Sequence, residues 1–328
     1  MNAPAPRYPG VSFILEWENA KHAGCDRAAS MLGELSRQIA ALRGAFLKPP
    51  EIIILFDASA QRKADIAVLV ARHWDAHKYP ADIRIEPAQS PGYYAQKNYG
   101  ATLSDRDWLV FVDSDIIPEA DWLEKLLNAR HASNAAIVSG QTYVAPTSLS
   151  DRAFALMWFF PLRSDATAPY DSDVFYANNF VIERSVFLSR PFPDMPLHRG
   201  QCYLLAHAIR AAGDRVEMCP AARVSHPPPN GVLHFVKRAL AAGHDFAVTD
   251  DMLGHEVDRS KLARSLSRAK WHIIHGFNKI SKRGPDLGLG MIGRINARML
   301  AVTYYSLAVL GELLSRAAPR TVFNLLKV

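Results

Sequence analysis

The sequence predicts an α/β protein in which a mostly parallel β-sheet is flanked by helices and followed by a C-terminal helical extension. Short apolar runs alternate with amphipathic segments of ten or more residues, which is typical of a parallel sheet with crossover helices. Acidic residues follow two of the apolar runs directly. Residues 237–328 add two long helical patterns. With 328 residues and 49% hydrophobic content, the chain is long enough for one large core and an appended module.

The expected elements follow one another regularly through the first part of the chain. The runs VSFIL and EIIILF are apolar throughout, as in strands that are buried on both faces of a sheet. We expect strands at residues 11–15, 51–56, 83–86 and 109–112. We expect helices at residues 26–43, 61–75, 92–103 and 201–212, with Gly213 as the stop signal of the last one.

The segment WLVFVDSD, residues 108–115, carries the strongest functional signal. Its apolar run ends on Asp113 and Asp115, and ligands of open α/β sheets bind beyond the carboxyl ends of such strands. Two neighbouring carboxylates repel each other unless a cation lies between them, and Mg²⁺ commonly brings substrate phosphates with it. The pattern therefore predicts a metal and diphosphate site. An Asp-rich turn that caps the next helix fits the same residues, because Pro118 and Glu119 follow.

A second acidic residue supports the site. Asp57 follows the strand at 51–56, so it falls on the same edge of the sheet as Asp113 and Asp115. An Asp-rich turn that is merely solvated would not need a further aspartate on the same edge, so Asp57 favours the binding site.

The segments VSFILEWENA, EIIILFDAS and AQKNYGATLSDRDWLVFVDSDIIPEADWLEKL resemble the family 2 glycosyltransferases, which have the nucleotide-diphospho-sugar fold called GT-A. The likeness spans Val11 to His226. It implies a nucleotide-sugar donor and a divalent metal, Mn²⁺ or Mg²⁺. The implied donor residues are Leu15, Glu16 and Asn19 beside the nucleoside, Asp57 on the base, Lys97 near the diphosphate and Asp113 on the ribose. The implied metal residues are Asp113, Asp115 and His226.

These implied roles agree with the chemistry of sugar transfer. Breaking a sugar–diphosphate bond leaves growing negative charge, which a divalent cation stabilises as a Lewis acid. Asp115 is then the direct ligand, and His226 a neutral imidazole ligand for an ion such as Mn²⁺. His226 is equally compatible with a strand end before the prolines at 227–229, and Lys97 with a solvated helix residue.

The sequence departs from the family where a general base is expected. The family places Glu-Asp at the start of a helix in the second half, and Gln201 and Cys202 occupy that position here. Asp194 and His198, in the preceding loop, are the nearest titratable candidates for a base. A reaction that needs no such base is also compatible with this departure, as is a protein that binds a nucleotide sugar without turning it over. His198 is also compatible with a surface loop position.

Two further groups of polar residues lie near the expected site. Asn178 and Asn179 stand where the family binds its acceptor, and their amides suit sugar hydroxyls, although an Asx turn explains them equally well. Glu16 and Glu18 replace a more neutral pattern in the first loop. These two acids are suited to selecting the nucleotide base or to binding another cation, and they are equally compatible with an exposed loop.

Charge is distributed unevenly, which predicts two domains, residues 1–236 and residues 237–328. The first contains 23 Lys and Arg against 25 Asp and Glu, a net charge of −2. The second contains 15 against 7, a net charge of +8. The tail therefore favours an anionic partner. No nucleic-acid-binding motif accompanies the basic residues, so nucleic acid is not expected.

The tail helices are expected at residues 260–283 and 291–314. The first combines seven Lys and Arg with apolar residues that include Trp271, a pattern typical of helices in an anionic membrane interface. Residues 299–311 of the second are free of charge but are too few to cross a bilayer, which needs ~20. Docking of both helices against the catalytic domain is the alternative.

The expected compartment is the cytoplasm, with peripheral contact at the inner face of the cell membrane. Residues 1–10 are Pro-rich and lack the apolar core of a signal peptide, and the three cysteines lack redox or metal spacing. The sequence as a whole predicts an inverting glycosyltransferase that moves a sugar from a UDP-sugar to a hydroxyl of a polysaccharide or lipid-linked acceptor. The alternatives are a non-catalytic nucleotide-sugar-binding protein and, less favoured, a nucleotidyltransferase, which the acidic first loop disfavours.

Overall fold

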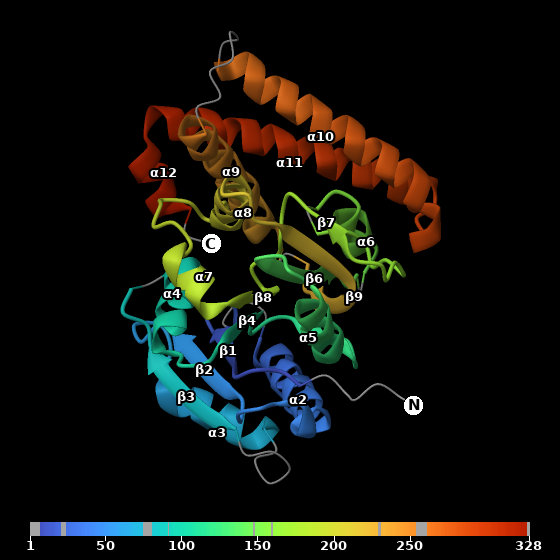
Figure 1. Cartoon of the computed structure of the whole chain (residues 1–328). Coiled ribbons are helices and arrows are strands. Elements are labelled where there is room, and N and C mark those ends of the chain that lie inside the picture. The colour runs from blue at the N-terminus through green and yellow to red at the C-terminus, as the bar shows by residue number, and fades with distance from the viewer. Residues whose placement is uncertain are drawn as a thin grey trace. The chain divides into compact units, whose positions relative to one another are not determined.

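The computed structural model describes residues 7–20, 24–74, 81–90, 92–146, 148–158, 160–228, 231–253 and 261–326 (Figure 1). The chain divides into two compact units. The first, here called the sheet unit, comprises Met1–Tyr143, Arg163–Asp194 and Cys202–Pro227. The second, the helical unit, comprises Val144–Leu162, Met195–Gln201 and Pro228–Val328. The helical unit thus takes in two segments from the middle of the chain as well as the tail. Ser260, Asp75 and residues 1–6, which figured in the sequence predictions, lie outside the described residues.

The first half of the sheet is parallel, as predicted. Its strands lie in the order β3-β2-β1-β4, and every residue of β1, β2 and β4 is buried. The helices that connect these strands cover both faces of the sheet. The strands are β1 (Val11–Glu16), β2 (Glu51–Phe56), β3 (Asp82–Pro87) and β4 (Trp108–Asp113), and the helices are α2 (Cys25–Ala41), α3 (Lys63–His73) and α4 (Tyr93–Leu103).

The second half of the sheet is antiparallel. The strand β8 (Asn179–Glu183) runs antiparallel to β4, and β6 (Ile137–Val144) runs antiparallel to β8. The short strand β5 (Ile117–Pro118) pairs with β9 (Val216–His226), with Ile117 opposite Ser225. That pairing brings the acidic motif beside the end of β9. The remaining elements are β7 (Tyr170–Asp171), α5 (Trp122–Ala132), α7 (Arg184–Ser189) and α8 (Gln201–Ala211).

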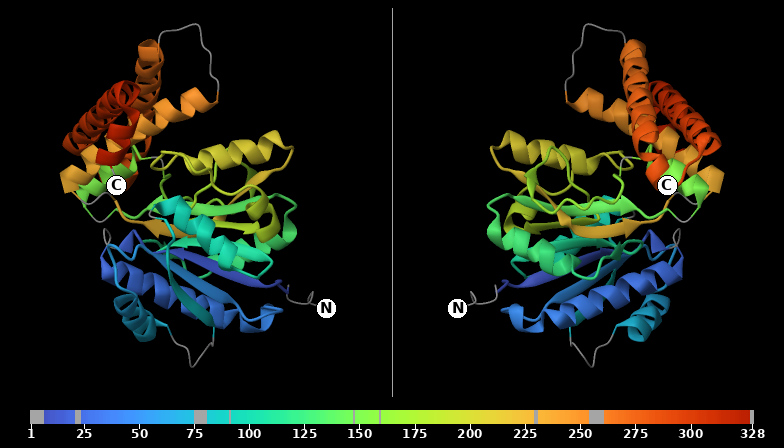
Figure 2. Two further views of the ribbon diagram at one scale, coloured as in Figure 1. Left: turned by 90° about the vertical axis from the view of Figure 1, so that its left-hand side faces the viewer. Right: turned by 90° about the vertical axis from the view of Figure 1, so that its right-hand side faces the viewer.

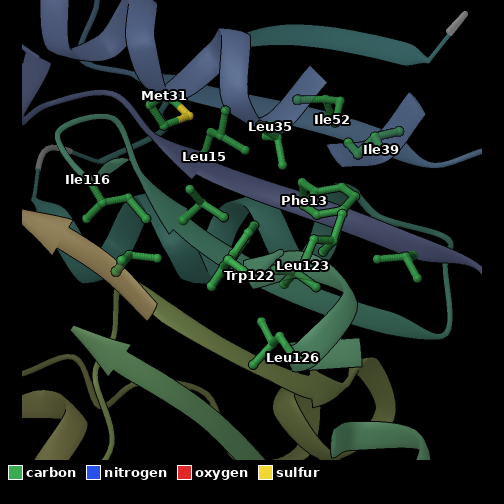
Figure 3. Close-up of a cluster of buried hydrophobic side chains, with 14 of the residues drawn as sticks. Phe13, Leu15, Met31, Leu35, Ile39, Ile52, Ile116, Trp122, Leu123 and Leu126 are labelled. Carbon is green, nitrogen blue, oxygen red and sulfur yellow. The ribbon is translucent and has the colours of Figure 1, made fainter. Parts of the chain in front are cut away.

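Apolar side chains cover both faces of the sheet and hold the helices to it. Because side chains alternate along a strand, Phe13 and Leu15 of β1 face one side while Ile14 faces the other. The first face packs against α2, α3 and α5, and the second against α4, α7 and α8 (Figure 2). Figure 3 shows Leu15 inside the first cluster, between Phe13 and Met31.

The helical unit contains both predicted tail helices. They are α10 (Lys261–Arg283) and α11 (Met291–Ala317), and they pack along each other (Figure 1). The unit also contains α6 (Leu149–Ala155), α9 (Gly231–Met252) and α12 (Pro319–Leu325). A Cβ atom on Gly243 of α9 would lie 1.9 Å from the carbonyl oxygen of Ala308, and one on Gly311 of α11 would lie 2.2 Å from that of Leu240. Glycine at these two positions therefore lets the backbones of α9 and α11 touch.

Candidate functional site

The predicted site residues gather where β1 and β4 end beside the β5–β9 pair. Glu16, the last residue of β1, lies opposite Asp113, the last residue of β4. Pairing of β5 with β9 brings Asp115 close to His226, at 3.5 Å between Oδ2 and Nε2. The sheet therefore assembles carboxylates and an imidazole from three strand ends.

Asp113 is fixed by hydrogen bonds on both of its carboxylate oxygens. Lys97 Nζ lies 2.6 Å from Oδ1, and the hydroxyl of Tyr93 donates to Oδ2 at 2.8 Å. Asn19 Nδ2 lies 3.3 Å from Oδ2. The Lys97 side chain is fully buried, so its ammonium group pairs with Asp113 and Lys97 is not a solvated helix residue. Asp113 is thus held in place by its neighbours, and Asp115 is the carboxylate that faces His226.

Glu16 adds a second buried carboxyl group to this cluster. Its Oε1 accepts hydrogen bonds from the backbone N–H groups of Glu18 and Asn19, whereas Oε2 is buried without a hydrogen-bond partner among the described residues. Burial raises the pKa of Glu16 well above its usual value, Asp113 raises it further, and Lys97 opposes both. Glu16 is therefore not the exposed loop residue that one interpretation of the sequence allowed.

The pKa of Asp113 is raised as well. Burial is the main cause, the charge of Lys97 opposes it, and the neighbouring Asp115 adds to it. Three carboxyl groups thus lie near the ammonium group of Lys97 and the guanidinium group of Arg27, so the carboxylates outnumber the cations when all are ionised.

His226 is oriented to present a lone pair to the acidic motif. Its Nδ1 lies 2.6 Å from the carbonyl oxygen of Pro227, and since a carbonyl oxygen only accepts, Nδ1 carries the proton. In the neutral ring, Nε2 then faces Asp115 as an acceptor. Histidine ligands of metals are commonly oriented by a hydrogen bond of this kind.

The chemistry of the pair fits a divalent cation that also binds phosphates. Among the residues that the structure describes, no group of three or more His, Cys, Asp or Glu is arranged to hold a metal ion. Asp115 and His226 supply one oxygen and one nitrogen ligand, so the remaining positions of an ion held here belong to water or a ligand. Cations bound through few protein groups and substrate phosphates are common at phosphate-transfer sites.

Arg27 holds the two halves of this pair together, and sequence reasoning missed it. Its Nε donates to the backbone carbonyl of Asp115, and its Nη2 donates to the carbonyl and the hydroxyl of Ser225 at 2.7 and 3.1 Å. Burial lowers the pKa of Arg27, and Asp115 raises it. Its acceptors lie 88 and 198 residues away along the chain, and backbone acceptors leave no sequence signal.

Asp57 and Leu15 have different surroundings at the same edge. Asp57 follows β2, and its Oδ1 accepts hydrogen bonds from the N–H and the hydroxyl of Ser59 at 2.9 and 2.7 Å. Its side chain remains partly exposed at the rim. The Leu15 side chain lies entirely in the core, so Leu15 offers no side-chain contact to a ligand (Figure 3).

The two asparagines expected on the acceptor side hold the fold together instead. Asn179 is fully buried; its Oδ1 accepts from Trp122 Nε1 at 2.7 Å, and its Nδ2 donates to the carbonyl of Ala222 at 3.2 Å. Asn178 is also buried, and its Oδ1 accepts from Thr142 Oγ1 at 2.9 Å. These amides link β6, β8, β9 and α5. The acceptor-binding role is therefore corrected to a structural one for Asn179, and Asn178 is largely withdrawn from solvent.

His198 belongs to the helical unit, and its surroundings there weaken it as a base. Its backbone N–H donates to Asp245 Oδ1 at 2.8 Å, and its ring lies against Phe323 with centroids 4.8 Å apart. Burial, followed by the charge of His244, lowers the pKa of His198 to about 3. An imidazole with this pKa is a weak base. His198 is also not the exposed loop residue of the alternative interpretation.

Gln201 begins α8, as the sequence predicted, and is buried. Its Nε2 donates to the carbonyl of Leu197 at 2.8 Å, and the first turn of α8 contains no acidic residue. Asp194 is exposed. Of the two predicted bases, Asp194 is thus the one in the sheet unit and in contact with solvent.

Comparison with known proteins agrees with this architecture. The sequence model of glycosyl transferase family 2 matches residues 28–188. No protein with a curated description matches the chain.

Two solved structures share the fold at low sequence identity. The mannosyltransferase PcManGT from Pyrobaculum calidifontis, in complex with GDP-Man and Mn²⁺, has a TM-score of 0.59 and 16% identity, covering 95% of this chain and 89% of its own. TarS residues 1–349 from S. aureus, in complex with UDP-GlcNAc, has a TM-score of 0.51 and 12% identity, covering 94% and 92%. The sequence match and the shared architecture together show that residues 28–188 form a family 2 glycosyltransferase domain, in a chain with the GT-A fold.

Proposed function

We propose that the enzyme transfers a sugar from a nucleoside-diphosphate donor, a UDP-sugar, to a hydroxyl of a polysaccharide or lipid-linked acceptor. The observation that carries this proposal is the pair formed by Asp115 and His226, whose Oδ2 and Nε2 lie 3.5 Å apart while Nδ1 is engaged with Pro227. The structural neighbours support a nucleotide-sugar donor and a divalent metal, since PcManGT was solved with GDP-Man and Mn²⁺ and TarS with UDP-GlcNAc.

The residues of the sheet unit have distinct roles in this proposal. Asp115 and His226 would hold a Mn²⁺ or Mg²⁺ ion, which would neutralise charge on the departing diphosphate. Arg27 keeps the two ligands at the right separation, and Asp113 is held by Lys97 and Tyr93 at the end of β4. Asp57 contacts the base from the rim, and Glu16 and Asn19 border the nucleoside.

The proton of the acceptor hydroxyl needs a base in an inverting displacement. We assign this role to Asp194, because its carboxylate is exposed and His198 is too weak a base at a pKa of about 3. Inversion follows from a single attack by the acceptor oxygen on the anomeric carbon, with the nucleoside diphosphate leaving from the opposite face. The reaction takes place in the cytoplasm, where nucleotide sugars are made.

A non-catalytic nucleotide-sugar-binding protein is the second candidate. It is favoured by one observation: the buried Gln201 begins α8 with its amide bound to Leu197, and no acidic residue stands in the first turn. Glutamine cannot accept the acceptor proton, so this candidate retains the donor site and lacks turnover.

One experiment separates the two candidates. Purified protein is tested for binding and for release of nucleoside diphosphate with UDP-, GDP- and dTDP-sugars, with Mn²⁺, Mg²⁺ or chelator. We expect metal-dependent binding of one UDP-sugar and slow release of UDP, both lost in Asp115→Asn and retained in the control Asp105→Asn, whose side chain is exposed. Tight binding without release, even with membrane extract as a source of acceptor, would favour the binding protein. Binding that ignores metal and Asp115 would contradict the proposed site.

A further inference from the structure

One face of α11 is apolar and exposed along most of the helix. Met291, Ile292 and Met299 are 63–73% exposed. At 100° per residue, the exposed large residues fall within one sector of about 140° that contains no charged residue. We call this sector the α11 apolar face; it comprises Met291, Ile292, Ile295, Met299, Val302, Leu310, Leu313 and Leu314.

The opposite side of α11 is tied to the rest of the helical unit. Gly311 meets the backbone of α9, and Ala301 and Ala308 are buried. Glu312 is also buried, and it pairs with Arg316 at 2.6 Å and with Arg268 of α10 at 3.4 Å. By length and composition α11 meets the criterion for a membrane span. Its buried ion pairs and its glycine contact show, however, that α11 packs against α9 and α10 and exposes only the α11 apolar face to solvent.

Part of α10 extends the α11 apolar face. Arg264 and Arg268 of α10 lie toward α9, because both approach Asp250 of that helix. Leu262 and Leu266 lie about half a turn around α10 from these arginines, so they point away from α9. Both are about half exposed. The α11 apolar face also points away from α9, and the two sets of side chains therefore look in the same direction.

The charge around this surface is strongly positive. Residues 261–326 contain eleven Lys and Arg and two Asp and Glu. Of the two acids, Glu312 is buried and Asp286 is paired with Arg283 at 3.0 Å. Lys270 and Lys282 are exposed on α10, and Arg320 is exposed on α12. A partner of this surface must therefore be apolar at its centre and anionic at its edge, as an acidic bilayer is.

We propose that the α11 apolar face, with Leu262 and Leu266 of α10, lies in the interface of an anionic lipid bilayer. Both helices run parallel to the membrane plane, and neither crosses it. From Met291 to Leu314 the face is roughly 35 Å long at ~1.5 Å per residue, which gives a flat contact along the surface. The proposal concerns the helical unit alone and does not depend on the donor site or on turnover.

Vesicle binding tests the proposal directly. The full chain is sedimented with vesicles of phosphatidylcholine, and with vesicles that also contain phosphatidylglycerol. We expect binding to the anionic vesicles and a loss of at least about tenfold in Met299→Glu/Leu310→Glu, since two charges would enter the apolar region. Val68→Glu is the matched control, because Val68 is equally exposed on α3 of the sheet unit. Equal binding by all three proteins would overturn the proposal.

Two further measurements distinguish other occupants of this surface. Lys270→Glu should weaken binding to anionic vesicles by about fivefold or more and leave weak binding to neutral vesicles unchanged. Alkaline carbonate should release the protein from cell membranes, whereas resistance would indicate a helix that spans the bilayer. Light scattering gives the oligomeric state. A stable dimer that Met299→Glu/Leu310→Glu dissociates, without vesicle binding, would show that a second copy covers this face.

Discussion

Each unit contains a cluster of buried carboxylates, and the two clusters are balanced by positive charge to different degrees. In the helical unit, Asp250 and Glu312 share the guanidinium groups of Arg268 and Arg316 at 2.5–4.0 Å. In the sheet unit, three carboxyl groups, those of Glu16, Asp113 and Asp115, lie near two basic side chains, Lys97 and Arg27. The pKa values of Glu16 and Asp113 are raised, with burial as the main cause.

We interpret this difference as one between a structural cluster and the proposed binding site. A balanced network gains little from another ion and loses stability when one partner is removed. A cluster with excess negative charge is destabilised by its own repulsion, and a cation that enters relieves it. Replacing one carboxylate by an amide should therefore change the free energy of unfolding differently in the two clusters.

The largest effect is expected in the sheet unit. Asp115→Asn should lower kcat/KM by about 10²–10³-fold, because the proposed oxygen ligand of the metal is lost. Its free energy of unfolding should stay the same or rise, since a charge near Asp113 and Glu16 is removed. Donor turnover and urea denaturation measure the two quantities. Lost stability with retained turnover would place Asp115 in a structural network.

Glu312→Gln is the corresponding change in the helical unit. We expect the free energy of unfolding to fall by about 3 kcal/mol, because Arg268 and Arg316 lose a buried partner. Urea denaturation followed by circular dichroism measures it. Asp286→Asn is the control, since Asp286 and Arg283 form an exposed pair expected to contribute ~0.5 kcal/mol. Similar values for both variants would mean that the buried network is as weak as a surface pair.

Arg27→Lys tests how the metal ligands are positioned. A lysine ammonium group cannot reproduce the fork that joins the carbonyls of Asp115 and Ser225, so Mn²⁺ affinity should fall about tenfold. Electron paramagnetic resonance of free Mn²⁺ measures the affinity. Arg37→Lys, on the exposed side of the same helix, should leave it unchanged. Unaltered Mn²⁺ binding in Arg27→Lys, with reduced stability, would make Arg27 purely structural.

The smallest expected effect is on the pH dependence of stability, and it comes from His272 in the helical unit. Burial, with Arg268 nearby, lowers the pKa of His272 to about 4. Between pH 4 and pH 6.5 the native state binds fewer protons than the unfolded state, so stability is full above this window and is lost as pH falls through it. His272→Phe keeps the stacking on Tyr305, whose centroid lies 4.8 Å away, and should remove about 1 kcal/mol of this dependence. Thermal unfolding across the window tests this, and parallel curves above pH 6.5 serve as the internal control.

The sequence predicted the elements whose signal is local. Strands β1, β2 and β4 were found because each is an uninterrupted apolar run, and Asp57, Asp113 and Asp115 were placed because they follow such runs. The tail helices were found from their periodicity.

What the sequence missed depends on contacts between distant segments. Arg27 binds backbone oxygens far along the chain. Lys97 was named as a site residue, but its burial against Asp113 leaves no signal in the sequence. Leu15 was predicted to border the nucleoside, but its side chain lies in the core. In a strand that is buried on both faces, the sequence does not show which side chains reach the edge of the sheet. His198 was taken for a base because the sequence does not show that its loop packs into the helical unit.

The glycine contact between α9 and α11 has a practical consequence for shortening this chain. Where two backbones touch at Gly243 and Gly311, no side chain is available to fill the space that either helix would leave. A truncation before α11 would uncover the buried surface of α9 and remove Glu312 from its arginine partners. Residues 291–317 are therefore an integral part of the folded helical unit, and a soluble variant is better sought by replacing exposed leucines and methionines than by cutting the helix away.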